Sequence, residues 1–305
     1  MGGALQAAGE AARAIETVSW VLIGGGFVMF AGVVLVLWRG LQRRAESLRP
    51  RLWVIGGGLI FPSAVLAALY AWQLPMSPAW KPVPPPDALV VGVTGHMWWW
   101  DVRYRDPATG ATIRTANEIR IPAGRPVYLA LDSADVIHSF WVPQLAGKMD
   151  MLPGRIQHLL LSADRPGTYR GQCAEFCGGQ HARMALHVVA MEPAAFEAWL
   201  ATQARPAAAA QTPLQQAGRD AFLANRCDAC HAVRGVGGDS RLGPDLTHLG
   251  GRLYLAAGTL PNTPQARQEW IAHVQQVKEG ARMPSYERLQ EEQLAAIADW
   301  LGALK

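Results

Sequence analysis

The sequence predicts a membrane-anchored protein of several domains: a hairpin of two transmembrane helices, then a β-sandwich, then a small helical domain. Three observations predict this arrangement. Two uncharged apolar segments lie close to the N-terminus, and about 20 apolar residues are enough to cross a bilayer. Short apolar stretches separated by Pro-Gly turns follow, as in all-β domains. The last part of the chain contains a Cys-x-x-Cys-His sequence, the motif that attaches a c-type haem.

Composition agrees with this class. The chain has 305 residues, which is enough for more than one domain. Hydrophobic residues make up 50% of it and charged residues 17%, which is apolar for a soluble protein. The net charge of +4 is too small to indicate a nucleic-acid-binding protein. All four cysteines belong to two motifs that bind metal or cofactor, so none is left for a structural disulfide.

The N-terminal region, residues 1–75, is predicted to be the transmembrane hairpin. Its uncharged segments are residues 17–38 and 52–74. Tryptophans near the segment ends match the aromatic belt of a membrane interface: Trp20, Trp38, Trp53 and Trp72. The intervening loop carries five arginines and one glutamate, and positive charge in a short loop marks the cytoplasmic side. We therefore expect both termini on the outer side. A buried hairpin of a soluble protein is the alternative, which the segment lengths and the tryptophans disfavour.

Residues 76–200 are predicted to form the β-sandwich. Residues 75–87 contain six prolines, which indicate a stiff, extended connection out of the membrane. Beyond them, apolar stretches bounded by turn residues are typical of strands: residues 89–93, 127–131, 156–161 and 185–190. Many short strands with turns between them favour a sandwich.

The most informative stretch holds two thiols, an imidazole and a thioether: Cys173, Cys177, His181 and Met184. Soft sulfur ligands combined with imidazole suit copper, and a single blue-copper ion uses one Cys with two His. One thiolate is therefore in excess, and two thiolates can bridge two coppers. Such a site needs a second imidazole, for which His138 is the best placed candidate. A zinc site, which has little use for the methionine, and a disulfide between the two cysteines are the alternatives.

Residues 214–305 are predicted to be a haem domain, joined to the sandwich by a low-complexity linker at residues 201–213. Cys227 and Cys230 have the spacing that meets the two vinyl groups of a haem, and His231 follows directly to reach the iron. A redox dithiol or half a zinc site would use the same cysteines without needing the adjoining histidine.

The haem needs a sixth ligand, and a methionine there raises its potential. Met283 is the only methionine after residue 191 and is the expected ligand, with His248 and His273 as competitors. Helices are expected at residues 217–225 and 267–279, and an apolar stripe of helical spacing marks a last helix: Leu294, Ile297, Leu301 and Leu304.

The copper-type stretch resembles the dinuclear copper A motif of cytochrome c oxidase subunit II, Cys-x-Glu-x-Cys-x-x-x-His-x-x-Met, at every fixed position. The resemblance extends over roughly residues 15–200 and implies a cupredoxin-like Greek-key sandwich whose copper ligands lie on loops at one end. It implies that Cys173 and Cys177 bridge the two coppers, and that His138 and His181 each cap one copper. Met184 is implied to be a weak ligand, and Glu175 to bind through its backbone carbonyl. The carboxylate of Glu175 is implied to reach a magnesium ion at the boundary with the catalytic subunit.

Residues 95–101, Gly-His-Met-Trp-Trp-Trp-Asp, resemble the aromatic cluster of the same family. There, the tryptophan that matches Trp98 is the point of electron entry to the copper. The family commonly has Gln and Tyr where this chain has Met97 and Trp99. Strand geometry alone would direct Trp99 to one face of a sheet, and Trp98 and Trp100 to the other.

Residues 214–305 resemble a class I cytochrome c, and the whole chain is similar to the fused subunit II of caa3-type haem–copper oxidases. The resemblance implies copper A and covalent haem c as cofactors, in a multi-pass protein of the cell membrane with both domains on the outer, periplasmic side. It implies the electron-input subunit of a proton-pumping respiratory oxidase, in which haem c reduces copper A and copper A reduces subunit I. Subunit III is an implied further partner, and cytochrome c or a quinol–cytochrome c reductase is the implied donor.

A membrane-anchored electron carrier that works outside an oxidase is the alternative function. No histidine precedes residue 96, so the transmembrane segments lack ligands for a haem–copper oxygen site. If the chain serves an oxidase, oxygen reduction has to take place on a partner chain. Copurification with a larger haem protein distinguishes the two functions.

Overall fold

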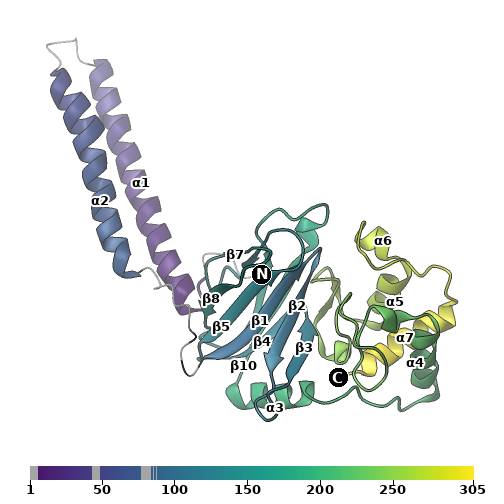
Figure 1. Cartoon of the computed structure of the whole chain (residues 1–305). Coiled ribbons are helices and arrows are strands. Elements are labelled where there is room, and N and C mark those ends of the chain that lie inside the picture. The colour runs from purple at the N-terminus through teal and green to yellow at the C-terminus, as the bar shows by residue number, and fades with distance from the viewer. Residues whose placement is uncertain (1–5, 43–48, 77–83, 85, 87) are drawn as a thin grey trace.

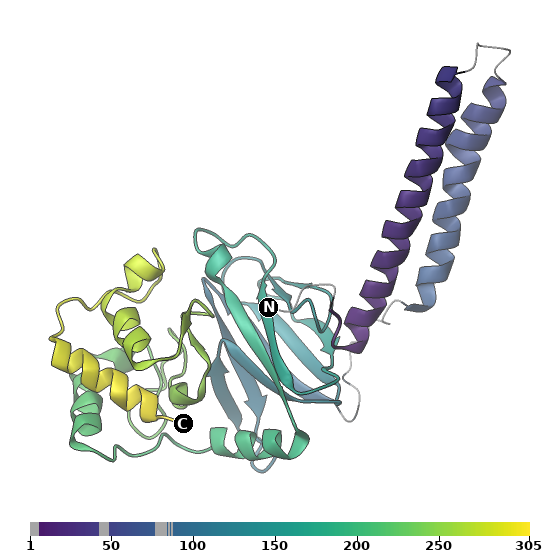
Figure 2. The same cartoon turned by 180° about the vertical axis from the view of Figure 1, so that it is seen from behind.

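The computed structural model describes residues 6–42, 49–76, 84, 86 and 88–305. Two long helices project from one side of a β-sandwich, and a helical domain lies against its other side (Figures 1 and 2). The predicted fold class, a helical hairpin followed by a sandwich and a helical domain, is confirmed.

The helical hairpin consists of α1 (Glu10–Gln42) and a second arm in which a π-helix, η1 (Leu52–Ile60), continues as α2 (Phe61–Gln73). A short 3₁₀ turn, η2 (Leu74–Met76), ends this arm. Both arms are long and apolar enough to cross a membrane. Most of the basic loop, residues 43–48, and most of the proline-rich stretch, residues 77–83, 85 and 87, lie outside the described residues.

The residues around the start of α1 pack on the sandwich. The amide of Ala8 donates to the carbonyl of Gln144 at 2.8 Å, and the amide of Asp164 donates to the carbonyl of Ala8 at 2.8 Å. Arg13 forms an ion pair with Asp164, and the side chain of Ala12 is buried. The first turn of α1 and the sandwich therefore lie at the same end of the hairpin (Figure 1).

The sandwich has two five-stranded sheets, in which the strand orders are β3-β2-β1-β5-β8 and β4-β10-β9-β6-β7. The first sheet comprises β1 (Leu89–His96), β2 (Trp99–Arg105), β3 (Thr112–Ala116), β5 (Val127–Ser133) and β8 (Gln157–Leu161). The second comprises β4 (Glu118–Pro122), β6 (His138–Trp141), β7 (Met149–Met151), β9 (Gly167–Cys173) and β10 (Ala185–Met191). Only β1–β5 and β4–β10 pair in parallel among the named strands of these sheets. The four predicted strand stretches are confirmed as β1, β5, β8 and β10.

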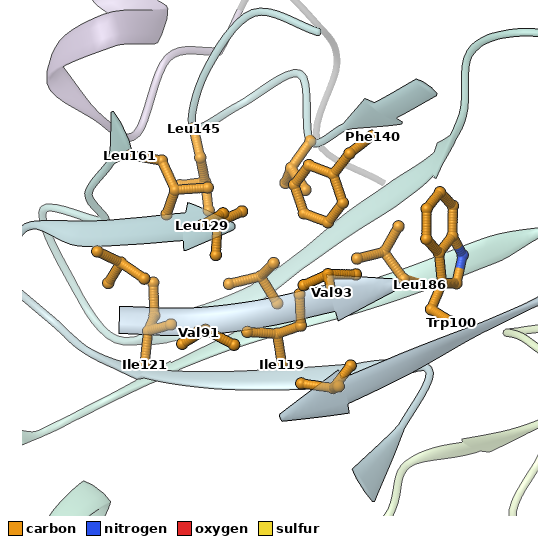
Figure 3. Close-up of a cluster of buried hydrophobic side chains, with 14 of the residues drawn as sticks. Val91, Val93, Trp100, Ile119, Ile121, Leu129, Phe140, Leu145, Leu161 and Leu186 are labelled. Carbon is orange, nitrogen blue, oxygen red and sulfur yellow. The ribbon is translucent and has the colours of Figure 1, made fainter. Parts of the chain in front are cut away.

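Alternating side chains of both sheets form the core between them, as period-two geometry requires. In β1, Val91 and Val93 are buried whereas Val90 is 45% exposed. Figure 3 shows how residues from the two sheets and a loop meet: Val91, Val93, Trp100, Leu129 and Leu161, then Ile119, Ile121, Phe140 and Leu186, and Leu145. A helix, α3 (Pro193–Gln203), follows β10, and Phe196 packs on Tyr104 of the sandwich.

The C-terminal domain is built from α4 (Pro213–Ala224), α5 (Pro264–Ala272), α6 (Val274–Val277) and α7 (Glu291–Ala303). Short 3₁₀ turns lie at η4 (Cys227–Ala229) and η5 (Leu249–Gly251), and β11 (Tyr254–Leu255) pairs with β12 (Leu260–Pro261). The side chains of Phe222 in α4 and Trp300 in α7 meet edge to face at 5.1 Å between ring centroids. Residues 204–212, between α3 and α4, contain no helix or strand.

The single helix expected at residues 267–279 is wrong. The backbone of His273 (φ −123°, ψ 40°) leaves the helical region and separates α5 from α6. The amide of Gln275 donates to the hydroxyl of Ser285 at 3.0 Å instead of continuing a helical ladder. An apolar pattern does not reveal such a side-chain acceptor, because Ser285 comes from a later loop. The apolar stripe predicted for the last helix is confirmed in α7.

Gly218 sets how closely α4 and α7 approach. A Cβ atom at this position would lie 2.0 Å from the carbonyl oxygen of Ala296 in α7. Helix propensity alone favours alanine over glycine by about 1 kcal/mol. The added Cβ atom would, however, force the two helices apart, and overpacking typically costs about 1–3 kcal/mol. We therefore expect Gly218→Ala to lower the free energy of unfolding of the C-terminal domain, measured by denaturant titration of the full chain.

Gly251→Ala is the matched control, because a Cβ atom at Gly251 meets nothing within 4 Å. Equal unfolding free energies for the two variants would contradict this account of the α4–α7 contact.

Candidate copper and haem sites

The copper-type residues converge at one end of the sandwich. His138 begins β6, Cys173 ends β9, and the other candidates lie in the loop between β9 and β10, which includes the 3₁₀ turn η3 (His181–Arg183). Ligand atoms of His138, Cys173 and Cys177 all lie within 4.8 Å of one another, and all four cysteines of the chain are free. The sequence-predicted residues are thus brought together from separate strands and one loop.

Each candidate ligand faces one of the two thiols. Nδ1 of His138 lies 3.8 Å from Sγ of Cys173, and Nδ1 of His181 lies 3.6 Å from Sγ of Cys177. The carbonyl oxygen of Glu175 is 3.2 Å from the first thiol. Sδ of Met184 is 3.8 Å from the second. This donor set, with two sulfurs in the centre and one imidazole on each side, could hold two soft metal ions.

The two thiols share a buried site, and this perturbs their ionisation. The hydrogen bond between them lowers the pKa of Cys173 and raises that of Cys177. Both side chains are only 3% exposed. Metal ligation requires deprotonated thiols, so binding at this pair releases the proton that Cys177 otherwise retains.

Asp135 holds the imidazole of His138 and was missed as a functional residue by the sequence analysis. Its Oδ1 lies 2.8 Å from Nε2 of His138, and its Oδ2 accepts from the amide of Met97 at 2.8 Å. Burial raises the pKa of Asp135, but the hydrogen bonds from these groups outweigh it and hold the pKa below its usual range. A carboxylate on the far nitrogen fixes the tautomer and directs Nδ1 to a metal. An acidic residue three positions before the candidate histidine was the available signal.

The three consecutive tryptophans have different surroundings. Trp98 precedes β2, so strand alternation does not apply to it, and its Nε1 donates to the carbonyl of Cys177 at 2.8 Å. Trp99 stacks on His96 at 4.3 Å between ring centroids. Trp100 is fully buried, 6.2 Å from the ring of His138. Trp98 therefore makes a direct contact with the backbone of the copper-type loop.

A cavity of about 360 Å³ lies between the C-terminal domain and the sandwich. From the C-terminal domain it is lined by the attachment residues and the predicted distal ligand: Cys227, Cys230, His231 and Met283. From the sandwich, Trp98 and Trp99 line it. The haem-type cavity and the copper-type loop therefore share Trp98.

The imidazole of His231, the predicted proximal ligand, is held in one orientation. Nδ1 of His231 lies 2.8 Å from the carbonyl of Pro244, which leaves Nε2 for a metal. Burial lowers the pKa of His231, so the ring is neutral. A Cβ atom at Gly243 would lie 2.7 Å from this ring, so the position requires glycine.

The rest of the lining fits a haem. Apolar side chains form much of the wall: Phe222, Leu246, Leu249, Ile297 and Leu301. The guanidinium of Arg252 also lines the cavity, and burial lowers its pKa. It donates through Nη2 to the carbonyl of Asp245, but its buried Nε has no partner. A buried cation with an unused donor suits the carboxylates of a haem.

The competitors for the sixth position lie elsewhere. His248 is absent from the cavity lining, and its Nε2 lies 3.1 Å from the carbonyl of Arg205. His273, likewise outside the lining, pairs with Glu287 at 3.5 Å. Met97 lines the cavity from the sandwich, whereas Met283 packs against the core of the domain that carries His231.

Comparison with known proteins finds two families in this chain. Residues 89–191 match the family described as cytochrome c oxidase subunit II, periplasmic domain. Residues 215–305 match the cytochrome c family. The chain joins a cytochrome c oxidase subunit II domain to a cytochrome c domain. The subunit II domain implies copper A, and the cytochrome c domain implies haem.

Two of the most similar relatives are named cytochrome c oxidase subunit 2. The chain is 37% identical over 219 residues to cytochrome c oxidase subunit 2 of Alkalihalophilus pseudofirmus, across 72% of this chain and 62% of the relative. It is 30% identical over 229 residues to the Bacillus subtilis subunit 2, across 72% of this chain and 63% of the relative. The chain thus spans a little under two thirds of these relatives. The periplasmic domain of subunit II from Bradyrhizobium japonicum is 27% identical, with a TM-score of 0.37, across 40% of this chain and 97% of that one.

Proposed function

We propose that this chain is the electron-input subunit of a proton-pumping haem–copper oxidase. Electrons would enter at haem c, pass to copper A and leave for subunit I, where oxygen is reduced. The observation that carries the proposal is the position of Trp98, which lines the haem-type cavity and donates a hydrogen bond to the carbonyl of Cys177. One aromatic side chain thus contacts both sites.

The chain's own residues would hold the two cofactors, which would supply one-electron transfer when bound. The proposed copper ligands are the two central thiolates with an imidazole and a weaker donor on each side: Cys173, Cys177, His138, His181, Met184 and the carbonyl of Glu175. The proposed haem ligands are the thioether cysteines, the proximal histidine and the distal methionine: Cys227, Cys230, His231 and Met283. Asp135 orients His138. The burial of His138, Cys173 and Cys177 keeps water away from the centre of the copper-type site, which limits the reorganisation that a charge change requires.

The surface around the copper-type loop supports a partner at this end of the sandwich. Phe176 lies between Glu175 and Cys177 in that loop and is 74% exposed. Val136 and Ile137, beside His138, are also exposed. Exposed apolar side chains gathered at a functional site mark an interaction surface. We assign this surface to subunit I. With the helices crossing the cell membrane, both domains would lie on its outer side, consistent with the start of α1 lying beside the sandwich.

Purification of the full chain from membranes tests the function. A multi-span haem protein should copurify, and the optical spectrum of the complex should show haem c, copper A and the haems of subunit I together. Recovery of the chain alone, with haem c and copper but without further haem, would favour the membrane-anchored carrier instead. A subunit III and the source of electrons, cytochrome c or a quinol–cytochrome c reductase, can be sought in the same preparation.

We also propose that the carboxylate of Glu175 serves a magnesium ion at the boundary with subunit I. Its carbonyl faces the copper-type site. Within the described part of the chain, its half-buried side chain accepts a hydrogen bond from the amide of Phe176, at 3.3 Å. Magnesium prefers carboxylate and water ligands. Glu175→Gln should therefore lower the occupancy of this site by magnesium, or by manganese in its place, and leave the copper content unchanged. Manganese in the purified complex is measured by paramagnetic resonance.

Glu197→Gln is the matched control for this prediction, because Glu197 is an exposed residue of α3. Manganese binding that is equal in the Glu175 variant and the wild type would remove Glu175 from the magnesium site.

A further inference from the structure

Several contacts hold the cytochrome c domain against the sandwich. The amide of Leu253 donates to the carboxylate of Glu118 at 2.8 Å, and Tyr254 stacks on His187 at 4.1 Å. Nearer the copper-type loop, the amide of Ala185 donates to the carbonyl of Ala257 at 3.0 Å. Most of these contacts join backbone to backbone or backbone to side chain, and each is individually small.

Lys278 makes three hydrogen bonds at this interface through a single atom, Nζ. It follows α6, and the residue is only 3% exposed. Its Nζ donates to the carbonyl of Trp98 at 2.7 Å, to that of Arg183 at 2.9 Å, and to that of Ala256 at 3.2 Å. A lysine ammonium has three donors, so all of them are used, and two of the acceptors belong to the subunit II domain.

We propose that Lys278 is a positioning residue that fixes the cytochrome c domain on Trp98 and so sets the separation of the two cofactors. The contact with Trp98 lies at the residue that bridges the two sites. The contact with Arg183 lies beside Met184, and the guanidinium of Arg183 in turn donates to the carbonyl of Val277. Lys278 is therefore tied to both the aromatic residue and the copper-type loop.

The same contact reaches the haem through a short loop. Residues 278–283 connect Lys278 to Met283, and the side chain of Gln275 forms hydrogen bonds with the backbone of this loop. Its Nε2 donates to the carbonyls of Ala281 and Met283 at 2.9 and 2.8 Å, and its Oε1 accepts from the amide of Gly280 at 2.9 Å. A Cβ atom at Gly280 would lie 3.5 Å from the ring of Trp98. The distal-ligand loop thus lies directly against Trp98, with Lys278 at its start.

Burial makes the ammonium depend on these acceptors. Burial lowers the pKa of Lys278 to about 7, because a charge removed from water has to be compensated. The three carbonyls compensate it in part, since the pKa stays below that of an exposed lysine. Lys278→Met has a similar length but no donor, and it would leave the carbonyls of Trp98 and Arg183 without this partner.

Amide hydrogen exchange of the full chain tests the contact without reference to activity. The amides of Ala185 and Leu253 bond across the interface. In Lys278→Met we expect their peptides to exchange about tenfold faster or more, the ratio expected when a hydrogen bond to a charged group is lost. Peptides from α4 and α7 should keep their protection, which shows that the domain remains folded. Lys278→Gln, which retains two donors, should give a smaller change.

Lys148→Met is the matched control, because the side chain of Lys148 is 53% exposed and pairs with an equally exposed residue, Asp150. Unchanged exchange of the Ala185 and Leu253 peptides in Lys278→Met would overturn the proposal. The proposal would also be overturned if Lys148→Met speeded exchange of these peptides as much as Lys278→Met does.

The consequence for electron transfer rests on the proposed function and needs a separate measurement. After rapid photoreduction of the haem, transfer to copper should be slower in Lys278→Met, with the potential of each cofactor unchanged. Faster exchange with an unchanged transfer rate would overturn the positioning role. An absence of transfer in the wild type would instead refute the proposed function and leave the Lys278 contact standing.

Discussion

Replacing Cys173 or Cys177 with serine is expected to abolish the two-copper spectrum. Each sulfur has one imidazole and one weaker donor beside it, at 3.2 to 3.8 Å, so the thiols form the shared centre of the donor set. A serine hydroxyl is a hard, protonated donor that does not replace a soft bridging thiolate. Copper content should fall from two ions to one or none per chain, measured by metal analysis and electron paramagnetic resonance.

Cys227→Ser provides the reciprocal control for this prediction. Cys227 lines the haem-type cavity, so its loss should weaken haem attachment and leave the copper signal intact. If either Cys173→Ser or Cys177→Ser retained two coppers with an unchanged signal, the bridging arrangement would be wrong.

Exchanging Met283 for histidine is expected to change the haem without releasing it. Met283 and His231 line the same cavity, and Cys227 and Cys230 remain to attach the haem. Methionine as the second axial ligand raises the potential relative to histidine. Met283→His should therefore lower the haem potential and erase the weak far-red band of iron–sulfur ligation. A lower haem potential makes the cofactor a stronger reductant, but harder to reduce by its own donor, so net electron entry should slow.

Met97→Leu is the control that distinguishes the two methionines of the cavity, because Met97 lines the cavity from the subunit II domain. The far-red band should survive in this variant. Survival of the band in Met283→His, or its absence from the wild type, would exclude Met283 as the ligand. His248 would be a poor replacement in the observed arrangement, since it faces the carbonyl of Arg205.

Local sequence patterns were sufficient for most of the architecture. The two uncharged segments predicted the helical arms, because a bilayer demands a continuous apolar stretch of fixed length. The apolar stretch at residues 127–131 predicted β5, because short apolar stretches bounded by turn residues are typical of strands. The pattern failed at residues 267–279, where the backbone leaves the helical region at His273 and the hydroxyl of Ser285, from a later loop, takes the amide of Gln275.

The candidate ligands were also visible in the sequence, since a metal or a covalent haem requires particular atoms at short, fixed spacings. Cys173 to Met184 and Cys227 to His231 are such local sets. Asp135 was overlooked because its role depends on the orientation of His138, which only the folded strand β6 fixes. His248 remained a competitor until the fold placed it outside the cavity lining.

The sequence by itself determined which chemical groups this protein offers: an apolar anchor, a copper-type set of sulfur and imidazole ligands, and a haem attachment motif. Each depends on residues close together in the chain, so spacing alone identifies it. The tertiary structure alone decided how the two sites meet. Trp98 and Lys278 are 180 residues apart, and no local pattern links an aromatic side chain of the sandwich to a lysine of the haem domain. Their contact arises from the packing of two domains, in which buried backbone carbonyls need donors and a buried ammonium needs acceptors.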